Sequence, residues 1–490
     1  MVQGVRDLSS SGHAALSDET EPSRWVHYFN LEDTTMKLTK SLLLASVAGF
    51  AAVASAQAAD LPSKKAAPVE YVKVCPTYGP GFFYIPGTNT CLRIGGAVTF
   101  DYQHGETYVR AADKTGMFAG ARLIADARDN TEYGLLRTFI QLDVNRATGQ
   151  RTTGSGTRIA YAINTTGAQY TGSQTQVHVS RAFVQIAGFT VGVMPSFYSF
   201  GYQAGMIGLE GGDAGFQAQG IAYTAALGQG FSATLAVEDS ANRREAINGA
   251  GAVNNGMPDV IGNLRLEQGW GSIQLSGAVH EVRDTVNAGA SASSVGAEYG
   301  YAGQLGVRVN LPMLAAGSSI VFQGGVSHGA SNYTLSNIAT ATGSSGPVGA
   351  LAGVNGSGVG TIGTNIGDAV WNGTKLELID AWTMGVMLNH QFTPRVAGFI
   401  GGSYTQIEFP ADAKASLLGA AATYANQPYN DANVMRVTGG AVWTPITGLN
   451  IIGEVQYAKM DLGIAQITTN NGNKKSDSAI TTRFRVTRAF

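Results

Sequence analysis

Cys75 and Cys91 are the residues of this chain whose type and spacing most plainly suggest chemistry, because they are its only cysteines. In an oxidising compartment such a pair favours a disulfide that closes a short loop, a link worth about 3 kcal/mol in the chain-entropy model. A zinc site is the alternative, although two thiols with no histidine near them leave the usual four ligands incomplete. The pair therefore predicts a disulfide if the chain is exported.

Two short glycine motifs match catalytic or cofactor-binding patterns. Residues 325–329 fit the G-x-S-x-G pattern of hydrolases, but no helix is expected to follow, and the nucleophile elbow needs one. Residues 358–363 fit G-x-G-x-x-G, but they lie in a Gly/Ser-rich stretch without a βαβ unit. The seven histidines are scattered. The sequence therefore nominates no catalyst, no cofactor and no metal site, and predicts a protein that is not an enzyme.

A secretory signal peptide is expected to span residues 36–58. Residues 36–40 are basic, residues 42–53 are apolar, and Ala56, Gln57 and Ala58 form the small-x-small cleavage pattern. A transmembrane helix is the alternative, but the segment is short and no stop-transfer run follows it. Residues 1–35 have no pattern of their own, and we interpret them as upstream sequence read through before a start at Met36.

The composition favours thinly spread apolar residues. Only 13% of the 490 residues are charged, with 32 Lys and Arg against 34 Asp and Glu. This balance excludes an acidic disordered chain and a basic nucleic-acid binder. Hydrophobic residues make up 44% of the chain, yet its mean hydropathy is +0.02, and the expected mature part contains no apolar run of the roughly 18 residues that a membrane helix needs. Alternating strands fit these facts.

A two-residue period of apolar and polar side chains marks strand after strand, so that each strand has one apolar and one polar face. The clearest apolar faces are Leu92, Ile94, Val98, Phe100 and Tyr102; Ala121, Leu123, Ala125 and Ala127; Leu136, Ile140, Leu142 and Val144; and Leu449, Ile451, Val455 and Tyr457. A soluble sandwich or a repetitive adhesin could also be built from such strands.

The connections between strands favour a membrane barrel over a sandwich, because short turns and long loops alternate. Turns are expected near 129–131, 187–189, 227–229, 268–270, 310–317, 391–394 and 444–448, and loops near 104–116, 147–174, 196–218, 240–258, 284–296, 329–373, 410–431 and 460–478. Seven turns and eight loops make sixteen strands, an even number with short turns on one side, as in outer-membrane barrels. A closed barrel of this size must hold water.

The chain resembles the general porins of alphaproteobacteria over essentially its whole mature part. The resemblance rests on the opening segments 71–75 and 81–93, on the strand pair 182–185 and 188–190, and on the closing segment 485–490. It implies a trimeric, sixteen-stranded antiparallel transmembrane β-barrel that passes ions and small hydrophilic solutes passively, with its third long loop folded inward. The terminal aromatic Phe490 resembles the signal that the outer-membrane assembly machinery reads.

The third long loop, residues 196–218, is rich in aromatics, contains no cation and carries two acids, Glu210 and Asp213. We expect these carboxylates to face arginines on the polar strand faces and to form a pore constriction with a transverse field. The facing cations are Arg93, Arg122, Arg128, Arg137 and Arg181. The alternative is a surface loop with two solvated carboxylates.

The expected organisation is an upstream segment 1–35, a signal peptide 36–58, a periplasmic or plug segment 59–91 that holds the cysteine pair, and a barrel over 92–490. The expected location is the outer membrane of a Gram-negative cell.

Two other functions stay open. A barrel phospholipase would need a serine and a histidine at the outer rim, for which Ser327 and His328 are the only candidates, and a surface adhesin would use residues 329–373.

Overall fold

The computed structural model describes residues 73–106, 114–151, 174–201, 216–245, 247–248, 252–253, 256–285, 297–335, 367–371, 375–415, 431–461, 467–469 and 472–490. The chain divides into two units, Met1–Tyr71 and Val72–Phe490, and all described residues belong to the second. The expected upstream segment and signal peptide, residues 1–58, lie outside the described residues. No helix among the described residues is long and apolar enough to cross a membrane.

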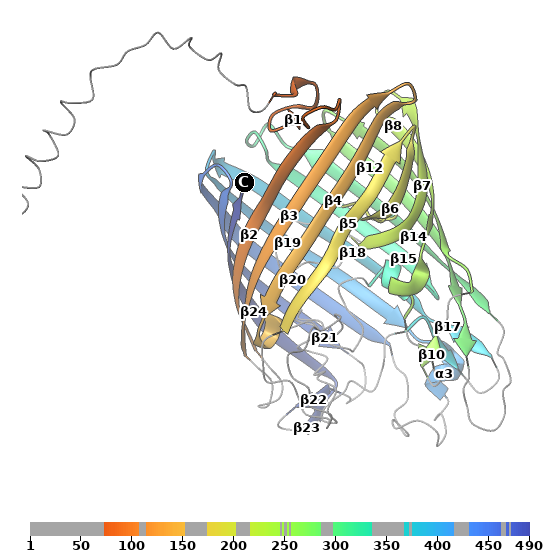
Figure 1. The fold of residues 1–490 in the computed structure, drawn as a ribbon. Coiled ribbons are helices and arrows are strands. Elements are labelled where there is room, and N and C mark those ends of the chain that lie inside the picture. The colour runs from red at the N-terminus through yellow and green to blue at the C-terminus, as the bar shows by residue number, and fades with distance from the viewer. Residues whose placement is uncertain are drawn as a thin grey trace, which may run out of the picture. The chain divides into compact units, whose positions relative to one another are not determined.

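The strand pairings join sixteen antiparallel strands into a closed ring, so the predicted all-β barrel is confirmed. Figure 1 shows the barrel from the side. The strands of the ring are β2 (Cys91–Gly105), β3 (Thr115–Thr131), β4 (Gly134–Ala147), β5 (Gln174–Ile186), β6 (Phe189–Pro195), β7 (Gln217–Gly228), β8 (Phe231–Glu238), β11 (Asp259–Gln268), β12 (Gly271–Val282), β14 (Glu298–Asn310), β15 (Ser319–His328), β18 (Asp380–Thr393), β19 (Val396–Glu408), β20 (Ala432–Ile446), β21 (Leu449–Asp461) and β24 (Ser476–Ala489).

Shorter elements lie before the ring and in its long connections. They are η1 (Pro76–Tyr78), β1 (Phe83–Tyr84), η2 (Gly149–Arg151), η3 (Ser240–Asn242), β9 (Ile247–Asn248), β10 (Ala252–Val253), β13 (Asp284–Thr285), η4 (Ser331–Tyr333), β16 (Ala369–Trp371), β17 (Leu376–Leu378), α3 (Ala411–Ala415), β22 (Ile467–Thr469) and β23 (Gly472–Lys474). The sequence did not predict these elements, because segments of two to five residues are too short to show a period.

The ring closes where the first strand pairs with the last. β2 pairs with β24 from Ala97 opposite Ala489 to Gly105 opposite Thr481, and Phe490 extends this pairing through reciprocal backbone hydrogen bonds with Gly96. Figure 1 shows the C-terminus at the same end of the barrel as β1. Every strand of the ring has two neighbours, although the short β6 pairs with β5 only from Ala182 to Ile186, so residues 174–181 of β5 are paired on the β4 side alone.

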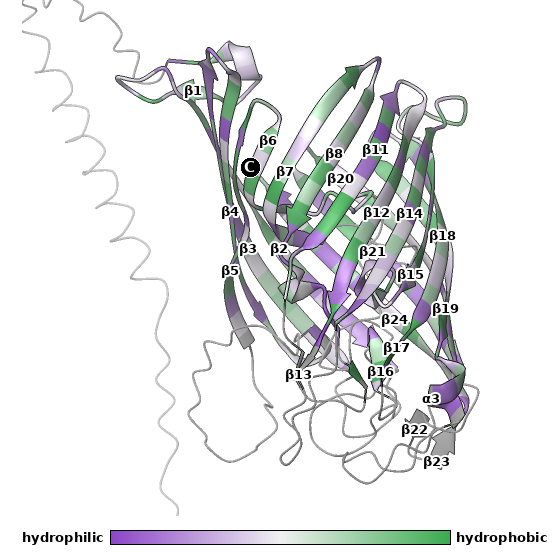
Figure 2. Ribbon diagram, turned by 90° about the vertical axis from the view of Figure 1, so that its right-hand side faces the viewer, coloured by the Kyte–Doolittle hydropathy of each residue, from purple (hydrophilic) through white to green (hydrophobic). Residues whose placement is uncertain are grey.

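The two faces of each strand differ in the way that the sequence predicts. On β2, Val98 and Phe100 point outward and are exposed, whereas Asp101 and Gln103 point inward and are buried. On β21, Val455 is exposed and Glu454 is buried. Figure 2 shows this alternation as hydrophobic and hydrophilic residues along the strands. The wall is therefore apolar outside and polar inside, the reverse of a soluble barrel.

Tight turns occupy one end of the ring, and β22, β23 and α3 lie at the other (Figure 1). Two of the turns, Ala187-Gly188 and Gln229-Gly230, have positive φ at both residues, as the tightest hairpin turns require. The first turn differs slightly from expectation, since β3 continues to Thr131. The Thr131 hydroxyl donates to the Gly134 carbonyl (2.7 Å) and moves the turn to residues 132–133.

The predicted disulfide between Cys75 and Cys91 is confirmed, with Cα atoms 6.0 Å apart. It closes a hairpin that leads from η1 through β1 into the start of β2. Two residues on the outer face of β24 also agree with the expected faces. Phe484 is exposed, and Arg488, on the same face, donates to the Thr447 carbonyl (2.7 Å) beside the last turn.

Closure should be sensitive to the side chain at position 96. A Cβ at Gly96 would lie 2.4 Å from the Arg122 carbonyl oxygen and 2.8 Å from the Phe490 ring, so Gly96→Ala should lower the yield of folded barrel. Gly453→Ala is the matched control, because a Cβ at Gly453 meets nothing within 4 Å. The folded fraction can be measured from heat-modifiable electrophoretic mobility. Equal yields for the two variants would contradict this reading of the closure.

Candidate functional site

All five arginines expected at the constriction lie on the inward faces of four neighbouring strands. Arg93 is on β2, Arg122 and Arg128 are on β3, Arg137 is on β4 and Arg181 is on β5. Their strand neighbours point outward, because successive side chains alternate between the two faces. The exception is Ser180, which precedes Arg181 at a register shift of β5 and also points inward, to Asp143. The structure thus brings these five side chains to one wall of the lumen.

The Asp126 carboxylate contacts three of these arginines. Arg128 and Arg137 each bind both of its oxygens, through contacts of 2.8 to 3.1 Å, and Arg93 lies 3.7 Å away. The Asp126 side chain is 0% exposed, whereas Arg93 is 45% exposed. Paired and bidentate contacts of this kind hold guanidiniums in fixed orientations. Asp126 was not predicted to belong to the site, although it lies on the same strand face as Arg128.

The other two arginines have different partners. Arg122 binds Asp143 through Nε at 2.7 Å, and Ser180 and Gln141 also donate to the Asp143 carboxylate. Arg181 donates to the Gln217 side chain at 3.3 Å. Together with the Asp126 group, these contacts show that most of the expected cations are tied to carboxylates of the wall itself.

A second arginine group, not predicted from the sequence, continues the wall onto β24. Arg485 binds both oxygens of Asp101 at 2.6 and 2.7 Å, and Arg151 of η2 reaches the same carboxylate at 2.9 Å. Arg483 donates to the Gln103 side chain at 3.0 Å. The alternation of Arg483 and Arg485 with the apolar Phe484 and Val486 was the available signal.

Cations outnumber acids on this wall among the described inward side chains of β24, β2, β3, β4 and β5. The carboxylates are Asp101, Asp126 and Asp143, and the guanidiniums are Arg93, Arg122, Arg128, Arg137, Arg181, Arg483 and Arg485. A water-filled lumen bordered by these groups therefore has an excess of positive charge on one side.

The third loop begins against the opposite wall. Gln274 and Gln304, which point inward from β12 and β14, donate to the Tyr198 carbonyl at 3.4 and 3.3 Å. The Glu238 carboxylate accepts from the Ser196 hydroxyl and the Phe197 amide at 2.8 and 2.9 Å. The structure describes this loop as far as residue 201 and again from 216. The two expected constriction acids, Glu210 and Asp213, lie outside the described residues.

Buried ionisable groups from separate loops and strand ends meet near this loop. Asp259 accepts from His280 at 2.8 Å and from the Tyr333 hydroxyl at 2.5 Å. Asp368 accepts from the backbone amides of Ser331 and Glu245 at 2.8 and 2.6 Å. The Tyr333 ring also contacts the Tyr198 ring, with centroids 4.7 Å apart. These contacts brace the start of the third loop against the loop between β15 and β18.

Glu245, in the loop after β8, is a member of this cluster with a strongly raised pKa. Burial and the neighbouring Asp368 carboxylate raise the pKa of Glu245 from its ordinary 4.5 to about 8, although Asn332 donates to its carboxylate at 2.5 Å and partly opposes that rise. A neutral, protonated glutamic acid is therefore the form that the folded chain prefers up to that pH.

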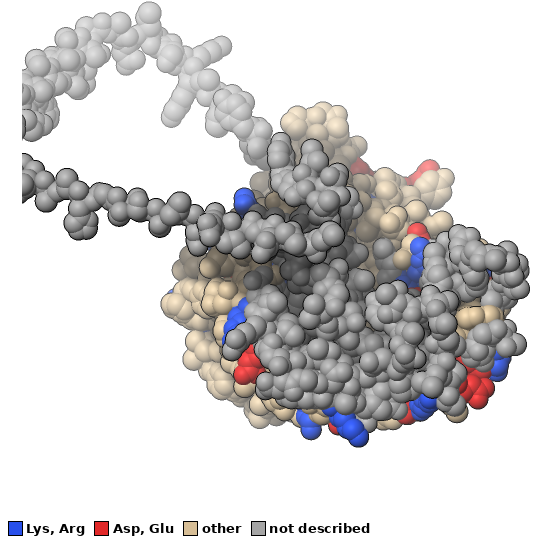
Figure 3. All heavy atoms as spheres, turned by 90° about the horizontal axis from the view of Figure 1, so that it is seen from below, with Lys and Arg blue, Asp and Glu red and all other residues tan. Residues whose placement is uncertain are grey.

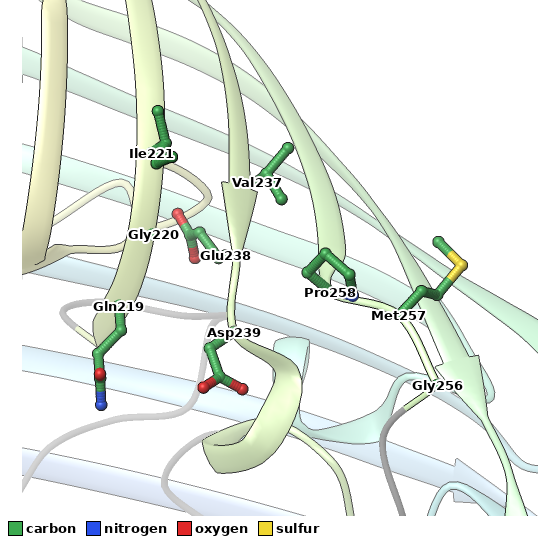
Figure 4. Close-up of a pocket in the computed structure, with 9 residues that line it drawn as sticks. All are labelled: Gln219, Gly220, Ile221, Val237, Glu238, Asp239, Gly256, Met257 and Pro258. Carbon is green, nitrogen blue, oxygen red and sulfur yellow. The ribbon is translucent and has the colours of Figure 1, made fainter.

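A cavity of about 500 Å³ lies between β7, the end of β8 and the segment that precedes β11, and no arginine lines it. Figure 4 shows its lining, which includes the outward side chains Ile221 and Val237 and the loop residues Met257 and Pro258. Ile221 and Val237 are exposed on the outer face, whereas Glu238, which also lines the cavity, is buried. Figure 3, seen from the long-loop end, shows described charges of both signs spread around the rim.

The candidate nucleophile and base at the rim do not form a pair. Ser327 is buried on the inward side of β15, whereas His328 follows it on the outward side, where it contacts Asp380 at 2.6 Å and the Tyr301 ring. Adjacent strand residues point to opposite faces, so Ser327 cannot give its proton to His328.

Comparisons with known proteins agree with this geometry. The model of the Porin subfamily matches residues 60–482. Porin Omp2a of Brucella ovis is 39% identical over 246 residues, which cover 48% of this chain and 68% of that protein. Porin Omp2b of Brucella suis biovar 1 is 37% identical over 242 residues, which cover 48% and 64%. The outer membrane channel DcaP of Acinetobacter baumannii shares the fold, with a TM-score of 0.57 at 12% identity over 83% of this chain and 99% of that one.

Removing the Asp126 charge should weaken the barrel strongly. Asp126→Asn leaves guanidiniums around a neutral side chain and should cost about 3 to 5 kcal/mol of unfolding free energy, as expected when one partner of a buried ion pair is removed. Glu267→Gln, which breaks the exposed Arg265 pair at 3.4 Å, should cost at most about 1 kcal/mol. Urea unfolding in lipid vesicles measures both. A loss for Asp126→Asn no larger than that of the control would contradict the role of Asp126.

Glu245 should make stability depend on pH. Because its pKa is raised from 4.5 to about 8 on folding, the contribution of its proton to stability is fully present below about pH 4.5 and is lost as the pH rises through about 8, so the wild-type chain should lose stability over this window. Glu245→Gln stays neutral and can still accept from Asn332, so it should lack this loss. Asn332→Ala should shift the loss to higher pH. Melting temperatures across the window test this, and a parallel loss in Glu245→Gln would contradict it.

Proposed function

The chain belongs to the Porin subfamily of outer-membrane β-barrel proteins, and we propose that it forms a passive, water-filled channel for ions and small hydrophilic solutes. The observation that carries this proposal is the closed ring of sixteen strands whose inward faces carry paired charges. Side chains cannot fill a ring of this size, and charged groups on its inner face favour water inside it.

The constriction that we propose is formed by the arginine wall on one side and by the third loop on the other. The hydrogen bonds from Gln274 and Gln304 to Tyr198 support an inward course for this loop, because both side chains point into the lumen. Glu210 and Asp213 would then face the guanidiniums of β2 to β5. Asp126 and Asp143 already neutralise part of that positive charge, so the transverse field is weaker than five free arginines would give.

A channel is favoured over an enzyme or an adhesin. The family consists of porins, and the separation of Ser327 from His328 by the strand wall supplies no hydrolytic pair. Most of the segment considered for adhesion, residues 336–366, lies outside the described residues. Passive permeation needs no cofactor and no catalyst, only the barrel and its lining.

The export and assembly of the chain belong to the same proposal. Residues 1–35 would be upstream sequence, residues 36–58 a signal peptide, and residues 59–91 a segment on the periplasmic side. Phe490, whose ring contacts the position of Gly96 at the closing seam, would serve as the signal for the assembly machinery. Three copies would form the trimer, which chemical crosslinking of the detergent-solubilised protein can test.

Planar-bilayer recording tests the channel and its constriction together. The purified wild-type chain should give stepwise conductance without any ligand. Replacing Glu210 and Asp213 together with Asn should lower the cation-to-anion permeability ratio, since two negative charges leave the pore. Asp412→Asn, on α3 in a different long loop, is the control and should change the ratio less. An unaltered ratio in the double variant would overturn the constriction, and a silent wild-type chain would overturn the channel.

A further inference from the structure

The disulfide-closed hairpin formed by residues 73–91 lies beside the arginine wall. Its two arms are joined by hydrogen bonds from the Cys75 amide to the Phe82 carbonyl (2.9 Å) and from the Tyr84 amide to the Lys73 carbonyl (2.8 Å). Cys91 has the same parity on β2 as Arg93 and therefore points inward. The Phe82 ring, like both cysteines, is almost completely buried. The hairpin thus holds an aromatic ring in a fixed place at the lumen wall.

The rings of this hairpin cover guanidiniums of the Asp126 group. The Phe82 centroid is 5.1 Å from Arg93 Cζ and 4.8 Å from Arg128 Cζ, and the Tyr78 centroid is 5.7 Å from Arg128 Cζ. Contacts within about 6 Å are attractive cation–π contacts. Arg128 therefore donates its N–H groups to Asp126 and also lies over two rings.

The position of the Arg93 guanidinium depends more on the Phe82 ring than the position of the Arg128 guanidinium does. The ion pair of Arg93 with Asp126 is long, at 3.7 Å, and the Arg93 side chain is 45% exposed. Phe82 is thus the nearest group that restrains the Arg93 guanidinium on its face. Without this ring, Arg93 would be free to extend its N–H donors into the lumen, where anions pass.

We propose that the hairpin of residues 73–91 is a selectivity element of the channel, which holds Phe82 and Tyr78 over Arg93 and Arg128 and so keeps these cations from permeating anions. This inference rests on the proposed channel function. The alternative is that the disulfide only fastens the start of β2, in which case the rings would affect stability and leave ion selectivity alone. The two readings therefore differ in a measurable quantity.

The test is the anion-to-cation permeability ratio, taken from reversal potentials in a KCl gradient. Phe82→Leu keeps an apolar side chain in the buried site but removes the ring. It should raise the ratio by about two- to fivefold, the range that one exposed cation–π contact corresponds to. The increase should be larger at low salt, where exposed charges are less screened.

The control variant lies on the same hairpin. Tyr84→Leu removes a ring that lies over Lys73, at 5.0 Å, rather than over the arginines, and it should keep the wild-type ratio. The double variant Cys75→Ser with Cys91→Ser releases the hairpin and should shift the ratio in the same direction as Phe82→Leu. If this double variant does not fold, Phe82→Leu, in which the disulfide is intact, still tests whether the hairpin affects ion selectivity.

The outcomes separate this inference from the channel itself. A conducting wild-type chain with an unchanged ratio in Phe82→Leu would overturn the selectivity role and leave the channel standing. An equal shift in Tyr84→Leu would also overturn it, because the effect would then come from the hairpin fold. A wild-type chain that does not conduct would instead refute the proposed function.

Discussion

The pairing of β2 with β24 is the contact on which the rest of this molecule depends. Hydrocarbon offers no hydrogen-bond partner, so every backbone amide and carbonyl of a membrane strand must find one in a neighbouring strand. The pairs from Ala97 and Ala489 to Gly105 and Thr481 give the first and last strands that neighbour. Closure also sets the circumference of the ring, and with it the width of the lumen that the inward side chains surround.

Inside that ring, the buried carboxylates are stabilised by ion pairs with arginines rather than enclosed by an apolar core. Asp126 and Asp101 are fully buried because guanidiniums surround them, and each carboxylate binds at least two arginines. Single exposed ion pairs contribute little, whereas networks with bidentate geometry hold their members in place. The result is a wall with fixed cations and a positive excess, which is the physical basis for a field across the lumen.

Different structural elements shape the two ends of the lumen. At the long-loop end, Glu238 and Tyr333 fasten the start of the third loop through hydrogen bonds and a ring contact. At the tight-turn end, the disulfide hairpin places Phe82 over the arginine wall. Both elements use residues that lie far apart in the sequence, and both act on groups that line the route of a solute.

The alternation of apolar and polar residues, together with the spacing of turns and loops, was enough to predict sixteen antiparallel strands, their faces and the inward direction of Arg93 and its companions. These properties are local, because a period of two residues decides which side of a strand each side chain occupies. The disulfide was also predictable, since only one cysteine pair exists. The residues that these side chains contact on other strands were not predictable. Asp126 meets Arg137 only because β3 and β4 pair in one register, Asp101 meets Arg485 only because the ring closes, and Phe82 meets Arg128 only because the hairpin folds back. Contacts between strands depend on register and closure, which only the tertiary structure decides.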